Sequence, residues 1–206
     1  MISIIDYGVG NLFSLRCSLD FLGVESRLVA DGESLHNSDK IILPGVGAFG
    51  DAAGALRASG LVPALLDAAR RGIPLLGICV GMQLLFEEGF EYGRHEGLGL
   101  LEGGIYPMQD DLTALGFDYK VPQIGWNALK INDPASPIAA NTRPGEHMYF
   151  VHSYYAKCPE ELIIAEAEYG VRVPAAVGRA NIFGSQFHPE KSGEAGLRFL
   201  RTFCEL

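Results

Sequence analysis

The stretch LLGICVGMQLL (residues 75–85) is the most informative part of the sequence for the fold, because the spacing of its apolar residues changes at a single cysteine. Residues 73–78 form a short apolar run that is typical of a buried strand. Residues 82–86 are also largely apolar, but they have the spacing expected at the start of a helix. Cys79 therefore lies at a predicted junction between a strand and a helix.

Strands and helices alternate around this junction through the first part of the chain. Strand-like runs are predicted over residues 1–8, 24–30, 40–47 and 73–79. Helical spacing is predicted over residues 11–23, 51–60 and 61–72. This alternation predicts an α/β protein with a parallel sheet covered by helices on both faces.

The second part of the chain changes character, because turn residues rather than helices separate its strand-like pieces. These pieces cover residues 98–106, 123–131, 147–156, 162–169 and 181–188. They predict a mostly parallel mixed sheet with an antiparallel portion. Residues 106–122 have the least regular pattern and are predicted to form a surface loop, whereas residues 192–206 are predicted to form an amphipathic helix capped by Ser192.

Length and composition limit the classes of function. With 206 residues, the chain is expected to form a single domain over residues 1–206. Its net charge of −9 and its lack of a basic run argue against a nucleic acid partner. Residues 1–11 lack the features of a signal peptide and no apolar run reaches membrane-spanning length, so we expect a cytoplasmic protein without membrane contact.

The four cysteines are widely spaced at positions 17, 79, 158 and 204, and none belongs to a paired motif. Together with the scattered histidines, they show no metal-ligand spacing, so neither a metal site nor any other cofactor is expected. Cys17 and Cys204 are predicted to be buried thiols that pack as small hydrophobic groups.

Cys79 is a candidate nucleophile. A helix N-terminus favours the thiolate, because its unpaired N–H groups and its dipole attract negative charge. Gly77 and Gly81 suit the close packing of a sharp strand-to-helix turn, as in a G-x-S-x-G nucleophile elbow with sulfur in place of oxygen. The motif alone leaves open a small core residue between two packing glycines.

A nucleophilic cysteine needs a base, and the base needs an orienting group. In FGSQFHPEKS, His188 and Glu190 are two residues apart, and Pro189 keeps the segment extended. Both side chains can then point to the same side, with Glu190 orienting the His188 imidazole towards the thiol. A surface histidine beside a salt-bridging glutamate is the alternative.

The other histidines are weaker candidates for the base. His36 and His95 lie in polar, loop-like stretches where solvation is expected. His147 begins a predicted strand, and His152 has aromatic neighbours that suit a hydrogen-bonded histidine within a strand.

The sequence GVGAFG, which begins at Gly45, formally matches a dinucleotide-binding G-x-G-x-x-G motif. Pro44 at the strand end and the helical setting of Asp67 argue against such a site, because no acidic residue ends a following strand. Exposed backbone N–H groups of Gly45, Val46 and Gly47 could instead form an oxyanion hole. A plain turn is the alternative.

Three motifs, PGVG, GICVGMQ and FHPE, follow one another along the chain. Together they resemble the class I glutamine amidotransferase family, whose catalytic triad is Cys, His and Glu. The further motifs DYGVGNLFSL, PGVGAFG, IGWN, YFVHSYY and QFHPEKS resemble the glutaminase subunits of imidazole glycerol phosphate synthases over nearly the whole chain. One departure is Gln123, where that family often has a histidine, and it concerns the partner surface rather than the triad.

The resemblance implies a flavodoxin-like three-layer fold and one subunit of a heterodimeric enzyme of histidine biosynthesis. The subunit would hydrolyse L-glutamine to glutamate and ammonia with the triad Cys79, His188 and Glu190. Ammonia would pass through a channel to a barrel-shaped cyclase subunit. The cyclase would produce imidazole glycerol phosphate and aminoimidazole carboxamide ribotide, and the complete synthase would thus have lyase activity.

The resemblance also implies roles for other residues. The oxyanion would lie against the backbone N–H groups of three residues, Val46, Gly47 and Val80. The glutamine substrate would be bound by Gly45, Gln83, Ser153 and Tyr154. The candidates for the surface that faces the cyclase are Asn11, Trp126, Tyr149 and Lys191. An exposed Trp126 would suit an interface anchor, whereas a core tryptophan is the alternative.

Three other functions remain open. The chain could supply ammonia to a different synthase, such as one that amidates a sugar, and Gln123 is the only hint of this. It could be a catalytically silent binding module that keeps the fold, although the intact triad argues against that. It could also be a cysteine peptidase or another thiol hydrolase, although the HPE pairing argues against this class.

Overall fold

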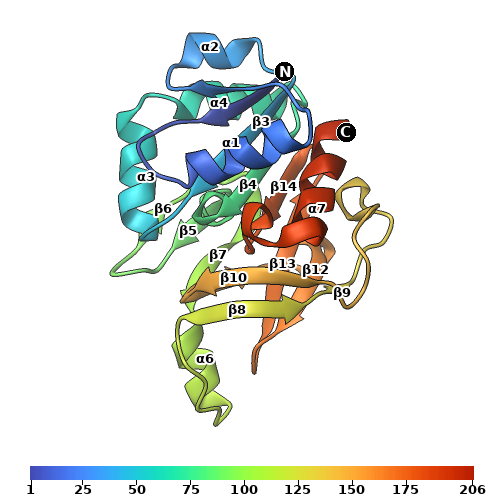
Figure 1. Cartoon of the computed structure of the whole chain (residues 1–206). Coiled ribbons are helices and arrows are strands. Elements are labelled where there is room, and N and C mark those ends of the chain that lie inside the picture. Colours follow the sequence, from blue (N-terminus) through green and yellow to red (C-terminus); the bar gives the residue numbers. More distant parts are fainter.

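An eight-stranded mixed sheet forms the centre of the computed structural model, which describes all of residues 1–206. Its strands lie in the order β2-β1-β3-β4-β14-β13-β12-β9 (Figure 1). Their bounds are β1 Ile2–Ile5, β2 Ser26–Val29, β3 Lys40–Gly45, β4 Leu75–Cys79, β9 Lys130–Ile131, β12 Ile163–Glu168, β13 Arg172–Arg179 and β14 Ile182–Ser185. The first five strands in this order pair in parallel and the last three pair antiparallel, which confirms the predicted mixed sheet.

Two smaller sheets extend the molecule beyond the carboxyl ends of the central strands. One has four strands in the order β11-β7-β5-β6 and the other pairs β8 with β10. Their bounds are β5 Phe86–Gly89, β6 His95–Glu96, β7 Leu101–Pro107, β8 Gln123–Ala128, β10 His147–His152 and β11 Tyr154–Lys157. In Figure 1 the β8–β10 pair lies across the lower half of the molecule.

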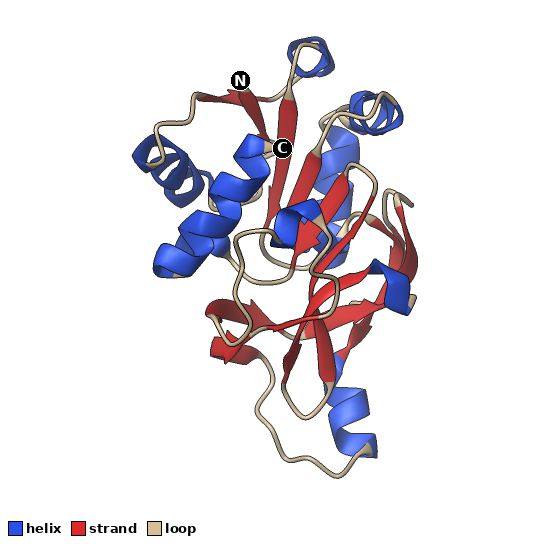
Figure 2. Ribbon diagram, turned by 90° about the vertical axis from the view of Figure 1, so that its right-hand side faces the viewer, coloured by secondary structure: helices blue, strands red, loops and turns tan.

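Helices cover both faces of the central sheet, as predicted. The helices α1 and α7 lie on one side of the strands, and α3 and α4 lie on the other (Figure 2). The helical bounds are α1 Leu12–Phe21, α2 Gly32–His36, α3 Phe49–Ala58, α4 Val62–Arg70, α5 Val80–Gln83, α6 Met108–Ala114, α7 Gly193–Glu205, and the 3-10 turns η1 Pro137–Ala139, η2 Glu160–Leu162 and η3 Pro189–Lys191. No helix has the length and apolar character that crossing a bilayer requires.

Several local predictions were wrong. Residues 106–122 contain the helix α6, because Met108 and Leu112 are buried on one of its faces. Cys17 is exposed, since it lies on the outer side of α1. Ser192 precedes α7 but forms no side-chain cap, because its hydroxyl is bonded to β10 and to the His188 carbonyl.

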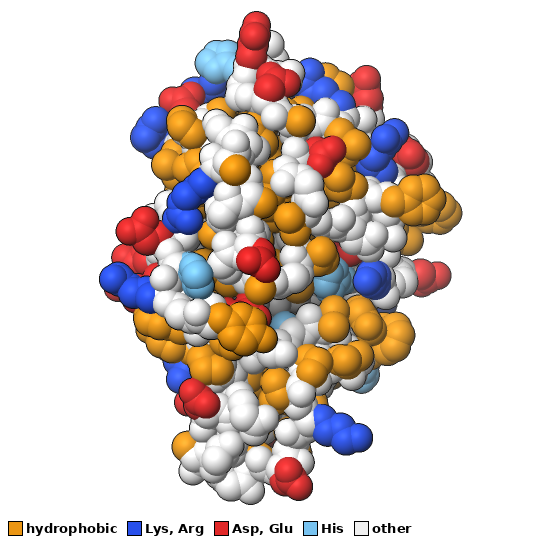
Figure 3. Space-filling model, turned by 90° about the vertical axis from the view of Figure 1, so that its left-hand side faces the viewer, with side chains coloured by type: hydrophobic (Ala, Val, Ile, Leu, Met, Phe, Trp, Pro, Cys, Tyr) orange, Lys and Arg blue, Asp and Glu red, His pale blue; other side chains and the backbone are white.

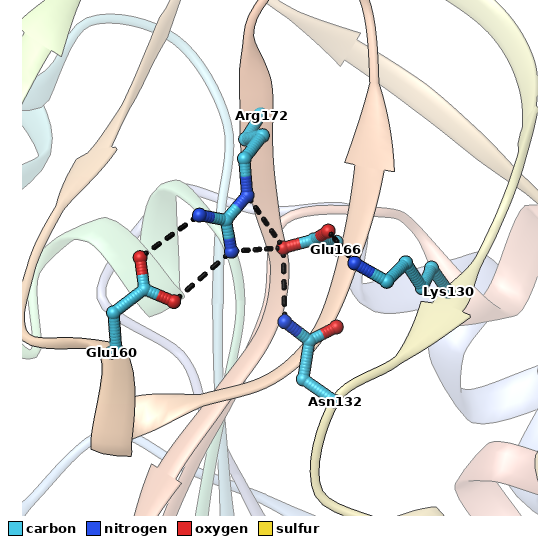
Figure 4. Close-up of polar contacts among 5 residues, drawn as sticks. All are labelled: Lys130, Asn132, Glu160, Glu166 and Arg172. Atoms are coloured by element: carbon cyan, nitrogen blue, oxygen red, sulfur yellow. Dashed lines mark hydrogen bonds and ion pairs between the residues drawn. The ribbon is translucent and has the colours of Figure 1, made fainter.

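An ion-pair cluster holds the edge of the central sheet together (Figure 4). The side chain of Glu166 is only 8% exposed, and it accepts hydrogen bonds from Lys130 at 2.8 Å and Asn132 at 2.9 Å. Arg172 donates to Glu166 and also pairs with Glu160 at 3.0 Å. Burial alone would raise the pKa of Glu166, but the hydrogen bonds outweigh it and lower the pKa to about 2. The cluster therefore ties the short strand β9 to β12 and β13.

Candidate active site

Cys79 is the last residue of β4, and the chain turns there directly into α5. Its backbone has φ +54° and ψ −112°, a conformation that residues other than glycine rarely adopt. The sharp turn directs the chain out of the sheet and leaves the thiol at the wall of a cavity. The predicted strand-to-helix junction is confirmed, but the helix predicted over residues 82–86 is wrong, because α5 ends at Gln83 and strand β5 begins at Phe86.

The two glycines around Cys79 allow the elbow to pack tightly. A Cβ atom on Gly77 would lie 2.6 Å from the carbonyl oxygen of Gly81. A Cβ atom on Gly81 would overlap the carbonyl oxygen of Leu43 in the neighbouring strand β3. Only residues without a side chain allow the elbow to approach β3 this closely.

His188 follows β14, and backbone contacts to β10 hold it in place. Its N–H donates to the carbonyl of Tyr149 at 2.9 Å. The hydroxyl of Ser192 donates to the His188 carbonyl at 2.7 Å and accepts from the Tyr149 N–H at 2.9 Å. These three hydrogen bonds fix the backbone position of His188 next to Cys79.

Glu190 orients the imidazole of His188. The ring Nδ1 lies 2.9 Å from Oε1 of Glu190, and both side chains are only 3% exposed. Since a carboxylate accepts, Nδ1 carries the proton and Nε2 remains available for the thiol. Burial disfavours the charged ring, but the adjacent Cys79 and Glu190 outweigh this and raise the pKa of His188 to about 10.

The loop after β3 supplies hydrogen-bond donors beside the thiol. The N–H groups of Val46 and Gly47 donate to no acceptor within the protein. Both residues line the cavity together with Val80, whose N–H belongs to the first turn of α5. The hydroxyl of Tyr7 donates to the carbonyl of Pro44 at 2.9 Å, which fixes the backbone just before this loop.

The cavity has a volume of about 300 Å³ and opens to solvent. Cys79 and His188 share its wall with three of the four predicted substrate-binding residues, Gln83, Ser153 and Tyr154. The fourth, Gly45, does not line the cavity. It is packed against the elbow instead, since a Cβ atom on Gly45 would lie 2.5 Å from the Gly81 backbone nitrogen. The cavity is large enough for an amino acid side chain and its α-groups.

Sequence reasoning missed two residues of the site. Glu91 lines the cavity, and its Oε2 accepts from the N–H of Phe49 at the start of α3. Gln186 is fully buried, and its amide contacts both Cys79 and Gln83. Glu91 lies in a turn with no distinctive pattern, whereas Gln186 could have been noticed from its position two residues before His188.

His152 also lines the cavity but is not suited to serve as the base. Its Nδ1 lies 3.0 Å from the carbonyl of Tyr154, and its Nε2 is buried without a partner. Burial lowers the pKa of His152 to about 4, so the ring is neutral at pH 7. The remaining histidines lie outside the cavity. His36 is exposed as expected, and His147 begins β10 as expected. His95 is half-buried against Gly50 rather than solvated.

Three of the four predicted partner-facing residues lie together beside His188. Trp126 is 60% exposed and packs edge-on against Tyr149, with a ring-centroid distance of 4.9 Å. The Nζ atom of Lys191 lies 5.8 Å from the centre of the same Tyr149 ring. Asn11 instead donates to Oε1 of Glu190 at 3.4 Å, so it contacts the candidate triad directly.

The arrangement has the chemical parts needed for acyl transfer. It combines a thiol, an imidazole held by a carboxylate, and unpaired backbone donors at one cavity wall. Such a set can attack a carbonyl carbon and stabilise the oxyanion that results.

Comparison with known proteins identifies relatives over the whole chain. A family model described as glutamine amidotransferase class-I matches residues 3–205. The imidazole glycerol phosphate synthase subunit HisH of Lactiplantibacillus plantarum is 48% identical, covering 100% of this chain and 96% of the relative. The HisH subunit of Wolinella succinogenes is 45% identical, covering 100% of both chains.

Solved structures with the same fold are more distant in sequence. The structure of PurLQS from Thermotoga maritima superposes with a TM-score of 0.75 at 23% identity, covering 99% of this chain and 97% of that one. The glutaminase domain of CTPS from Trypanosoma brucei, with bound acivicin, gives a TM-score of 0.64 at 16% identity, covering 99% and 93%. At these identities the likeness shows the fold alone.

Proposed function

Because the chain belongs to the class I glutamine amidotransferase family, we propose that Cys79, His188 and Glu190 are the triad with which it hydrolyses glutamine. The single observation that carries the assignment is that Cys79 and His188 face one cavity while Glu190 holds the imidazole. Full-length identity of 45% and 48% to curated subunits identifies the activity as that of the glutaminase subunit of imidazole glycerol phosphate synthase, in histidine biosynthesis.

The first half of the proposed reaction transfers the glutamyl group to sulfur. His188 takes the thiol proton, and the Cys79 sulfur attacks the side-chain amide carbon of glutamine. The C–O π electrons move to oxygen, and the oxyanion lies against the backbone N–H groups of Val46, Gly47 and Val80. As the intermediate collapses, the C–N bond breaks and His188 gives its proton to the departing ammonia.

The second half restores the enzyme. His188 takes a proton from water while the water oxygen attacks the thioester carbon, and a second oxyanion forms at the same N–H groups. The C–S bond then breaks, glutamate leaves, and the sulfur regains a proton from His188. Throughout, Glu190 holds Nδ1 and stabilises the protonated ring.

The cavity wall also suits the amino acid end of glutamine. Both hydrogens of the Gln83 amide are used, by the Tyr154 carbonyl at 3.1 Å and by Gln186 at 3.0 Å. Its Oε1 is therefore the group left to accept a hydrogen bond from substrate. We assign the α-ammonium group to this oxygen and to the carboxylate of Glu91, and the α-carboxylate to Ser153 and Tyr154.

The synthase has a second subunit, and we propose that it is the cyclase that uses the released ammonia. An exposed patch beside the active site supports this assignment, since Ile124 is 62% exposed and Trp126 is 60% exposed. Large apolar side chains gather in this way at protein interfaces. Figure 3 shows hydrophobic side chains grouped beside a hollow in this face of the molecule. A partner that covers Trp126, Tyr149 and Lys191 would receive ammonia directly from the site.

The test is ammonia release from glutamine under three conditions: this chain alone, with the cyclase, and with the cyclase plus its nucleotide ligand. We expect release to be fastest in the third condition and to disappear in Cys79→Ala. Equal release in all three would keep the glutaminase but contradict its dependence on the cyclase. Release by Cys79→Ala at the unmodified rate would contradict the triad.

A further inference from the structure

Gln186 is a buried polar residue that contacts the proposed nucleophile and has no part in the mechanism above. It is 0% exposed and lies between the end of β14 and His188. One end of its amide lies 3.8 Å from Sγ of Cys79, and the other lies 3.0 Å from Nε2 of Gln83. A buried amide is expected to be fully bonded, so these two contacts define its role.

The backbone determines the orientation of both amides. The carbonyl oxygen of Tyr154 can only accept, so the Gln83 atom that lies 3.1 Å from it is the nitrogen. The same nitrogen donates to Gln186, which must therefore present its oxygen to Gln83. The amide atom of Gln186 that faces Sγ of Cys79 is consequently its NH₂ group.

Besides His188, which exchanges the proton with the thiol, the sulfur has one polar neighbour suited to each of its protonation states. The carbonyl of Val151 lies 4.0 Å from Sγ and can accept from the neutral thiol. A carbonyl repels a thiolate, whereas the N–H of Gln186 attracts it. Because the contact with Gln83 on α5 prevents the Gln186 amide from rotating, the donor stays in place when the thiol loses its proton.

We propose that Gln186 is a further catalytic residue, which donates a hydrogen bond to the Cys79 thiolate and is held in that orientation by Gln83. The inference rests on the proposed role of Cys79 as nucleophile. The thiolate occurs twice in the cycle, before attack on glutamine and as the group expelled when water opens the thioester. Gln186 therefore contributes to both halves of the reaction.

The test is the pH dependence of Cys79 alkylation by iodoacetamide, which reports the thiolate without any turnover. Alkylation is followed on the Cys79 peptide by mass spectrometry, because Cys17 is exposed and also reacts. Gln186→Glu keeps an oxygen for Gln83 but replaces the donor beside sulfur with a second oxygen. We expect the midpoint of the alkylation profile to move to higher pH by about one unit. At pH 7, kcat for glutamine should fall about tenfold, with KM little changed.

Two further variants separate this role from general damage to the core. Gln83→Met frees the Gln186 amide to rotate, so a smaller upward shift of the midpoint is expected. Asn181→Asp is the control for an amide-to-acid change, because the Asn181 amide nitrogen is likewise a bonded donor. It donates to two backbone carbonyls, at 3.0 and 2.8 Å, at the far end of the β4–β14 pair. The midpoint of this variant should equal that of the unmodified protein.

The outcomes distinguish this inference from the proposed function. An unchanged midpoint in Gln186→Glu, with an active and alkylated parent protein, would overturn the role of Gln186 alone. A parent protein that releases no ammonia with its partner and whose Cys79 resists alkylation would overturn the role of Cys79 itself. A shift of equal size in Asn181→Asp would show that the midpoint responds to an acid introduced anywhere along this strand pair and would also overturn the inference.

Discussion

Gly45, the last residue of β3, pairs in parallel register with Cys79, the last residue of β4. The two strands therefore end level with each other, so the loop that begins at Val46 and the elbow at Cys79 leave the sheet side by side. This register places free backbone N–H groups next to the thiol without any contribution from side chains. The same closeness makes the glycines of the elbow essential to the fold, which leads to the first prediction.

Gly81→Ala should destabilise the protein by roughly 3 kcal/mol, because its Cβ would overlap the carbonyl oxygen of Leu43. Gly54→Ala is the matched control, since Gly54 lies within α3 and an added methyl group there would meet open space. This variant should be more stable than the unmodified protein by roughly 0.5–1 kcal/mol. Urea denaturation of both variants gives the free energies of unfolding. Equal free energies of unfolding for Gly81→Ala and Gly54→Ala would show that β3 can move away from the elbow.

Cys79→Gly should be more stable than Cys79→Ala by about 1 kcal/mol, although neither can hydrolyse glutamine. The reason is the backbone at this position, whose φ of +54° strains alanine but not glycine. The backbone at Cys158 does not have a positive φ, so Cys158→Ala should be more stable than Cys158→Gly. Urea denaturation gives the free energy of unfolding of all four variants. If the glycine and alanine variants have the same order of stability at both positions, the elbow is not strained.

Glu190→Gln should lower glutamine hydrolysis by roughly a hundredfold to ten-thousandfold, because His188 loses the carboxylate that orients it. The pH dependence of stability provides a second measurement. The pKa of His188 is raised from 6.5 to about 10 in the folded state, so its contribution is fully present below pH 6.5 and is lost as the pH rises towards 10.

Between about pH 6.5 and pH 9, the unmodified protein should therefore lose more unfolding free energy than Glu190→Gln does. The comparison uses urea unfolding at the two pH values. An identical loss in both proteins would mean that Glu190 does not stabilise the protonated ring of His188.

Trp126→Ala should weaken binding of the cyclase by about thirtyfold, which corresponds to about 2 kcal/mol for an interface anchor. Its effect on the isolated chain should be small, because the side chain is 60% exposed. Phe21→Ala is the control, since Phe21 is 78% exposed at the end of α1 and is not among the residues beside His188. Titration calorimetry measures the affinity of each variant for the cyclase. Equal affinities of Trp126→Ala and Phe21→Ala would argue against a cyclase surface at Trp126.

Much of the fold was predictable from the sequence because the signals are local. The apolar strands and the spacing of Leu15 and Leu19 in α1 predicted the layered α/β arrangement, and the parallel strands of the central sheet were found where expected. The strands β5 and β13 were missed. Residues 106–122 were mistaken for a loop, since α6 buries only Met108 and Leu112 against a distant part of the chain. A helix that depends on tertiary packing leaves a weak pattern.

The chemistry of the candidate site was already present in the sequence, because Cys79, His188 and Glu190 lie in short motifs whose residue types and spacing are visible without a structure. The surroundings of these three residues became known only from the folded chain. Its cavity also includes Glu91, and its core holds Gln186 against the thiol, whereas Gly45 lies behind the wall and Asn11 contacts Glu190. The physical reason is that these contacts connect segments between 42 and 179 residues apart, which meet only because parallel strands end at one edge of the sheet.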